Sequence, residues 1–214
     1  MISDPRNPIV NQSNVPRVLR KVVINERVTE SADMPVVAVA NCRSLEPKIN
    51  SIIEKIENEE IDVMIAVEIW EKIGKKNKHF LNKITEMTEI KGLKYISCGA
   101  RLSGKRGGGA GIFVNLRKYS LSTLEVNVPH NLEVKWGIVR KKTNVSNSKY
   151  TDFIICIFYS PPASRKHKKL LDHLVSTTHA LLAKYPRAAV ILGADKNSLP
   201  LAPLCRRCPG SGIL

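Results

Sequence analysis

The stretch FIICIFY (residues 153–159) decides the fold class. It has six consecutive apolar residues followed by a tyrosine, and two prolines come one residue after the tyrosine. An apolar run of this length between turn residues predicts a strand that is covered on both faces. The runs VVAVA (36–40), VMIAV (63–67) and AAVIL (188–192) have the same character. Such strands are expected where helices cover one face of a sheet and a second sheet covers the other.

Helical periodicity fills the segments between these strands. Apolar residues recur at helical spacing from Leu45 to Ile56, and Ser44 is the expected N-cap. A weaker helix is predicted over 77–90 and a long one from about 166 to the residue before Pro186.

Further strands are predicted at 93–97 and 111–114, and 121–128 is expected to pair antiparallel with 134–139. The predicted fold class is α/β: a layered sandwich of two packed mixed sheets flanked by helices. Residues 1–34 are polar and aperiodic, so we expect them to form a poorly ordered leader before a single domain.

The charge balance indicates a polyanionic partner. The chain has 34 Lys and Arg against 19 Asp and Glu, a formal net charge of +15, which favours nucleic acid or an anionic membrane surface. Of the phosphate-bearing partners, DNA is favoured over a small ester. No apolar run is long enough to span a membrane and the start lacks a secretion signal. Five irregularly spaced cysteines suit reduced thiols, so a nuclear or cytoplasmic, non-secreted protein is expected. Nothing in the sequence predicts an obligate protein partner.

Polar residues follow the four apolar runs. They are Asn41, Glu68, Tyr159 and Asp195, with Asn197 two residues further on. If the strands run the same way, these side chains meet at one rim of the sheets, where sites gather. Carboxylates and carboxamides match Mg²⁺, which takes one or two protein carboxylates and keeps waters or phosphate oxygens. Taken singly, each residue also fits an ordinary turn or strand end.

The order of these motifs resembles the endonuclease/exonuclease/phosphatase superfamily, and within it the endonuclease domain of non-LTR retrotransposons, which is similar to apurinic/apyrimidinic endonucleases. The resemblance covers residues 35–204. It rests on five motifs in order: NCRSL (41–45), VEIW (67–70), GGGAGIFV (107–114), FYSPP (158–162) and LGADKNSL (192–199).

The resemblance implies Mg²⁺-dependent phosphodiester hydrolysis of DNA, with Mn²⁺ as a possible substitute. By position, Glu68 matches the metal-binding glutamate and Asn41 the asparagine that holds metal and phosphate. Tyr159 matches the phenol beside the scissile phosphate. Asp195 matches the aspartate that orients or deprotonates water, and Asn197 the carboxamide that stabilises the phosphorane.

Basic residues near these motifs are expected to contact the DNA backbone; they are Arg43, Lys105 and Arg106. Trp70 and Trp136 are interpreted as core residues. The paired cysteines of 205–208 lack the second pair that a zinc site needs.

One departure from the family affects the expected activity. The family ends in a Ser-Asp-His motif, whereas residues 205–214 form a divergent tail and no histidine follows His179. We therefore expect a fold that is incomplete at the C-terminus and impaired catalysis. Two alternatives stay open: a non-enzymatic nucleic-acid-binding remnant of the domain, or a phosphatase of the same superfamily.

Overall fold

The computed structural model describes residues 34–71, 75–99, 107–143, 150–161 and 166–195, except the side chains of residues 75–77 and 195. The elements in chain order are β1 (Val37–Asn41), the 3₁₀ turn η3 (Glu46–Lys48), α1 (Ile49–Asn58), β2 (Val63–Val67), α2 (Lys75–Ile90), β3 (Leu93–Ser97), β4 (Ala110–Asn115), β5 (Tyr119–Thr123), β6 (Glu133–Lys141), β7 (Asp152–Tyr159), α3 (His167–Lys184) and β8 (Ala188–Asp195). The predicted leader, apart from Met34, and the tail at 205–214 lie outside these ranges.

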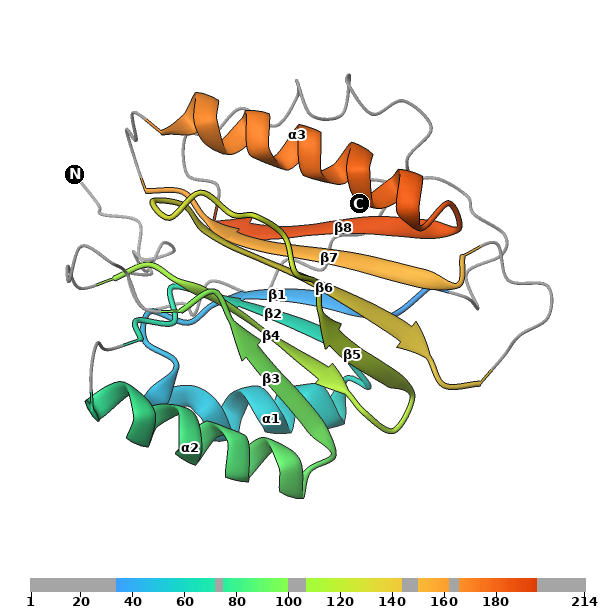
Figure 1. Ribbon diagram of the computed structural model, residues 1–214. Coiled ribbons are helices and arrows are strands. Elements are labelled where there is room, and N and C mark those ends of the chain that lie inside the picture. The colour runs from blue at the N-terminus through green and yellow to red at the C-terminus, as the bar shows by residue number, and fades with distance from the viewer. Residues whose placement is uncertain (1–33, 72–74, 100–106, 144–149, 162–165, 196–214) are drawn as a thin grey trace, which may run out of the picture.

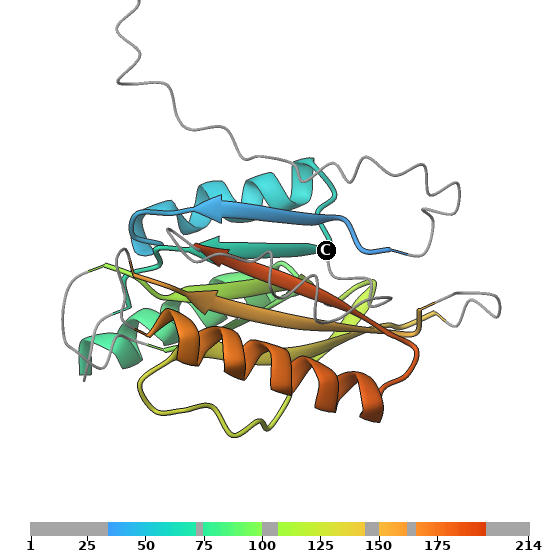
Figure 2. The same ribbon diagram turned by 90° about the horizontal axis from the view of Figure 1, so that it is seen from above.

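The strands form two four-stranded mixed sheets, in the orders β1-β2-β4-β3 and β5-β6-β7-β8. The pairs β1–β2 and β7–β8 are parallel, and the other neighbours are antiparallel. Helices α1 and α2 cover the outer face of the first sheet, and α3 covers the outer face of the second (Figure 1). Seen from above, α1 and α3 lie on opposite sides of the two sheets (Figure 2). The predicted α/β sandwich is confirmed.

Strand alternation divides the apolar residues among three layers. On β2, Val63, Ile65 and Val67 pack between the sheets, while Met64 and Ala66 face the first helical layer. The same alternation holds on β7 and β8, where even positions pack against α3. Strands buried on both faces explain the unbroken apolar runs of the sequence.

Two local predictions were wrong. The helix after β1 begins at Ile49, because Ser44 has φ = +90° in a turn and cannot act as the N-cap. The strand expected over 121–128 ends at Thr123, and a loop runs from Leu124 to Leu132 before β6. No helix within the described ranges is long and apolar enough to cross a bilayer.

The two sheets approach each other closely where β8 lies over β2. A Cβ placed on Gly193 would lie only 2.2 Å from Cδ1 of Ile65. Glycine is therefore required here by space rather than by backbone angle. This contact fixes β8 above β2. Gly193 and Ile65 are each two residues before the end of their strand, so β8 ends at Asp195 above the end of β2 at Val67.

We expect Gly193→Ala to destabilise the fold by about 1–3 kcal/mol, the usual cost of overpacking a filled core. Chemical denaturation would measure the change in the free energy of unfolding. Ile65→Ala is the matched partner variant, because it removes the atoms that the new methyl group would strike. The double variant should lose less than the sum of the two single variants. Additive losses would show that Gly193 does not limit the distance between the sheets.

Candidate active site

Three turns lie side by side at one rim of the first sheet. The amides of Cys42, Ser44 and Leu45 donate to the carbonyls of Val67, Glu68 and Ile69, at 2.8, 2.8 and 3.1 Å respectively. The amide of Trp70 in turn donates to Gly108 O at 3.1 Å. The turns after β1 and β2 and the turn before β4 therefore form one hydrogen-bonded layer.

The backbone of this layer is strained. Five non-glycine residues of the described chain have positive φ, and four of them lie in these turns: Arg43, Ser44, Glu68 and Trp70. Gly107, Gly108 and Gly109 also have positive φ, between 79° and 97°. Such conformations cost free energy and cluster where function needs them.

The Glu68 carboxylate is held by the first of two consecutive glycine amides. Its Oε2 accepts a hydrogen bond from Gly108 N at 3.0 Å and another from Trp70 Nε1. Trp70 is half-buried rather than part of the core, so the prediction for this residue was wrong, whereas Trp136 is 1% exposed as predicted. The indole is therefore part of the site, where it fixes the orientation of the glutamate.

The next amide holds a carboxylate from the other sheet. Gly109 N donates to Oε2 of Glu133, the first residue of β6, at 3.2 Å. Side chains larger than hydrogen do not fit at Gly109, where a Cβ would lie 2.9 Å from Ile69 Cγ1. The glycine turn therefore joins the rims of the two sheets through Glu68 and Glu133.

Strand register carries this link to the ends of β7 and β8. Glu133 lies opposite Tyr159, and Tyr159 lies opposite Asp195. Tyr159 is 7% exposed and occupies the same strand face as Ile157, the face toward the first sheet. The backbone of Asp195 is thus at the same rim as Glu68, while its side chain is outside what the structure describes.

Asn41 ends β1 at this rim and is exposed. Its Oδ1 accepts the Arg43 amide at 3.2 Å, which closes a local turn. Arg43 is itself exposed and lies beside Ser44, which bonds to the turn of Glu68. The structure thus brings Asn41, Arg43, Glu68, Tyr159 and the Asp195 backbone to one rim.

The remaining predicted site residues, Asn197, Lys105 and Arg106, lie outside the described residues. In the described part, no three His, Cys, Asp or Glu side chains are grouped in a way that could hold a metal ion. The described oxygen donors at the rim include the carboxylates of Glu68 and Glu133 and the carboxamide of Asn41. This donor set fits Mg²⁺, which needs few protein ligands.

Two half-buried groups near the rim have altered pKa values. Glu71 accepts the Tyr95 hydroxyl at 3.3 Å, and burial raises the pKa of this carboxyl although hydrogen bonds from Ser97 and Tyr95 oppose the shift. Burial also raises the pKa of Cys98 to about 12, and the nearby charges of Glu133 and Glu71 add to the effect. Cys98 is therefore a neutral thiol at the rim.

Sequence reasoning missed Glu133, Trp70 and Glu71 as rim residues. It looked only for polar residues at the carboxyl ends of strands, but β6 runs antiparallel to β7 and begins at the rim. A search for polar residues at the starts of antiparallel strands would have found Glu133. The four apolar strands lie as two parallel pairs, β1–β2 in one sheet and β7–β8 in the other.

Three solved structures have folds similar to that of this chain. A D. rerio TDP2 humanized by 14 mutations is 9% identical, covers 82% of this chain and 70% of its own, and gives a TM-score of 0.51. The endonuclease domain of TRAS1, a telomere-specific non-LTR retrotransposon, is 12% identical, with 75% and 59% covered and a TM-score of 0.51. The mannosyl-6-phosphatase Bt3783 of Bacteroides thetaiotaomicron is 18% identical, with 75% and 64% covered and a TM-score of 0.52.

The chain has the endonuclease/exonuclease/phosphatase fold. No protein-family model and no curated protein matches the sequence. The chain spans 59–70% of the length of the three structures compared. At these identities the likeness concerns the fold, and the same fold serves nucleases and phosphatases.

The raised pKa of Glu71 predicts a pH dependence of stability. The folded protein binds the Glu71 proton more tightly than the unfolded chain, so the stability from this group is present at low pH. It is lost as pH rises from 4.5, the ordinary pKa of a glutamate, through the higher pKa of the folded state. We expect Glu71→Gln, which keeps an acceptor for Tyr95, to raise the melting temperature at pH 7 more than at pH 4. An equal change at both values would contradict this assignment.

Proposed function

We propose that this chain carries a metal-dependent phosphodiester hydrolase site that acts on DNA, with Mg²⁺ as the expected ion. The observation that supports it most is the position of the Glu68 carboxylate, held at the rim by Gly108 N and Trp70 Nε1. A carboxylate oriented by two donors is preorganised for a fixed ligand rather than for solvent.

The charge of the rim supports a cation in this place. Glu68 and Glu133 accept hydrogen bonds from neighbouring amides, so two carboxylates approach the same turn. A phosphodiester is itself an anion and would be repelled by this pair. A divalent cation at Glu68 and Asn41 would remove the repulsion, polarise a phosphate oxygen and stabilise the charge that develops there.

The chain's own residues supply the other steps of the proposed reaction. Tyr159 is fixed opposite Glu133 and would orient a phosphate oxygen by its hydroxyl. Asp195 would accept a proton from the attacking water as the new P–O bond forms and the bond to the leaving oxygen breaks. Asn197 would donate to a non-bridging oxygen. The products are an alcohol and a phosphomonoester.

Nucleic acid is the substrate class that the charge favours over a small phosphate ester. A net charge of +15 attracts a polyanion along its length, whereas a small ester needs only a few local donors. The TRAS1 domain, an endonuclease of a retrotransposon, has a similar fold, which is compatible with this proposal. The alternatives remain a nucleic-acid-binding remnant without activity and a phosphatase.

The proposal is tested by nicking of supercoiled plasmid in Mg²⁺, with Mn²⁺ as a second ion and EDTA as the metal-free control. We expect nicking that depends on the metal. Glu68→Gln should lower its rate by a factor of about 10² or more.

Glu54→Gln is the matched control, because Glu54 is an exposed glutamate on α1 and should leave the rate unchanged. Titration with Mn²⁺, followed by its paramagnetic signal, would show whether Glu68→Gln weakens metal binding. Metal-independent nicking, or nicking that Glu68→Gln does not change, would refute the site. Metal binding and DNA binding without any nicking would establish the remnant instead.

Binding to duplex DNA should be weak, without strong sequence preference and strongly dependent on salt. A protein that contacts 6–10 phosphates loses about 10³–10⁵ in affinity between 50 and 200 mM salt, because counterions are released. Fluorescence anisotropy with one labelled duplex and one scrambled duplex would measure both properties. An affinity that stays constant over this salt range would contradict a backbone-directed mode of binding.

A further inference from the structure

A large cavity opens beside the proposed catalytic residues. It has a volume of about 1350 Å³ and reaches Glu133 and Tyr159 at the rim. Its other walls are the loop from Leu124 to Leu132, the first residues of β6 and the start of α3. Known small-molecule sites have volumes of about 300–1,000 Å³, so this space can hold a nucleotide.

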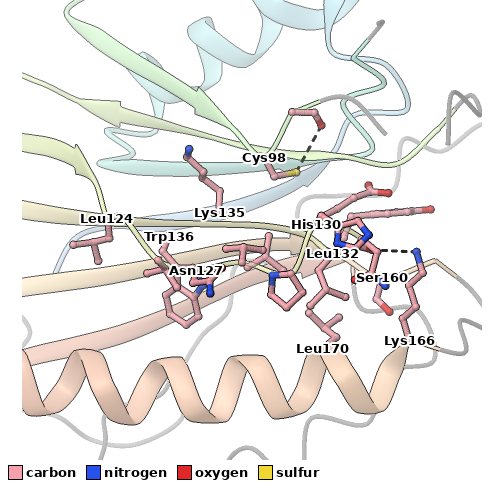
Figure 3. Close-up of a pocket in the computed structure, with 18 of the residues that line it drawn as sticks. Cys98, Leu124, Asn127, His130, Leu132, Lys135, Trp136, Ser160, Lys166 and Leu170 are labelled. Carbon is pink, nitrogen blue, oxygen red and sulfur yellow. Dashed lines mark hydrogen bonds between the residues drawn. The ribbon is translucent and has the colours of Figure 1, made fainter. Parts of the chain in front are cut away.

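The two ends of the cavity differ in chemistry. His130, Ser160 and Lys166 gather at one end, and Leu124, Asn127 and Trp136 lie toward the other (Figure 3). Lys166 reaches from the start of α3 to the loop, where its ammonium donates to Asn131 O at 3.1 Å. The end that holds the Lys166 ammonium adjoins Tyr159, the residue before Ser160, and the Glu133 carboxylate lies opposite Tyr159. A phosphate of the substrate would lie on the Lys166 side.

The interior offers a surface for an apolar ring together with one hydrogen-bonding group. Leu132, Val134 and Leu170 line it and belong to or pack against the core beneath α3. Asn131 also lines it, and its Oδ1 is buried without a hydrogen-bond partner among the described residues. A buried acceptor of this kind is satisfied by a ligand donor such as the amino group of a base.

We propose that this cavity binds one unpaired, base-bearing nucleotide next to the scissile phosphate, so that the preferred substrate is DNA with a gap, loop or overhang. A base within a duplex presents neither its faces nor its pairing edge to a cavity, whereas an unpaired base presents both. Lys166 contacts the nucleotide's phosphate, the apolar wall packs against the base, and Asn131 accepts from the base edge. The inference rests on the proposed function and specifies its substrate.

The experiment compares two labelled oligonucleotide duplexes by fluorescence anisotropy in EDTA, one fully paired and one with a single unpaired nucleotide. We expect the second to bind about tenfold more tightly. Lys166→Ala and Asn131→Ala should each reduce this preference, and Leu132→Trp should remove it by filling the space.

Lys168→Ala is the matched control, since Lys168 is an exposed lysine on the same helix that does not line the cavity. It should weaken binding of both duplexes equally and leave the ratio unchanged. Equal affinity of the wild-type chain for the two duplexes would overturn the inference, as would a ratio that Lys166→Ala and Asn131→Ala leave intact.

A further arm adds a sugar phosphate as competitor. Displacement of the unpaired substrate at equimolar competitor would assign the cavity to a small ester and overturn the inference. Because binding is measured without metal, this test is separate from plasmid nicking. If the wild-type chain prefers the unpaired nucleotide but does not nick plasmid, the hydrolase proposal is refuted and the cavity assignment stands. If it nicks plasmid without this preference, the cavity assignment is refuted and the hydrolase proposal stands.

Discussion

Two consecutive backbone amides hold the rim of this fold together. Gly108 N donates to Glu68, which follows the first sheet, and Gly109 N donates to Glu133, which begins a strand of the second. Both donors belong to a turn whose glycines have positive φ. A side chain at Gly109 would strike Ile69, so sequence, backbone angle and packing require the same residue. The glycine turn therefore fixes the positions of the Glu68 and Glu133 carboxylates. These two hydrogen bonds in turn hold the rim of the first sheet next to the rim of the second.

Close packing in the interior also fixes the two sheets relative to each other. Gly193 lets β8 lie directly over Ile65 of β2, so the two strands approach the rim together. The sheets are thus fixed to each other once by close packing and once by hydrogen bonds. Close packing resists sliding, because interiors have the density of crystals and no room for displacement. The ends of β2, β7 and β8 are placed by the core rather than by the loops that follow them.

Much of the fold could be predicted because its strands are buried on both faces, which leaves unbroken apolar runs that a reader can find. The helix start at Ile49 could not be predicted, because Ser44 has a positive φ and its amide donates to Glu68 O, a contact between turns that are far apart in the sequence. Asn41, Glu68 and Tyr159 could be predicted as neighbours from their strand ends. Glu133 could not, since its place depends on an antiparallel partner that no local pattern specifies. Trp70 was predicted as a core residue because tryptophan is mostly apolar, and the sequence does not show that its Nε1–H donates to Glu68.

The same fold carries a retrotransposon endonuclease and a mannosyl-6-phosphatase, so the strand-end residues alone cannot determine the substrate. Discrimination must come from what surrounds the rim. Here the surroundings are a strongly basic chain and a cavity that has Lys166 at the end near Tyr159. The long-range charge attracts any polyanion, and it does so without regard to sequence. The cavity acts only over contact distance and can therefore distinguish one nucleotide from the next. Attraction and selection thus belong to different parts of the molecule, and they can be altered separately.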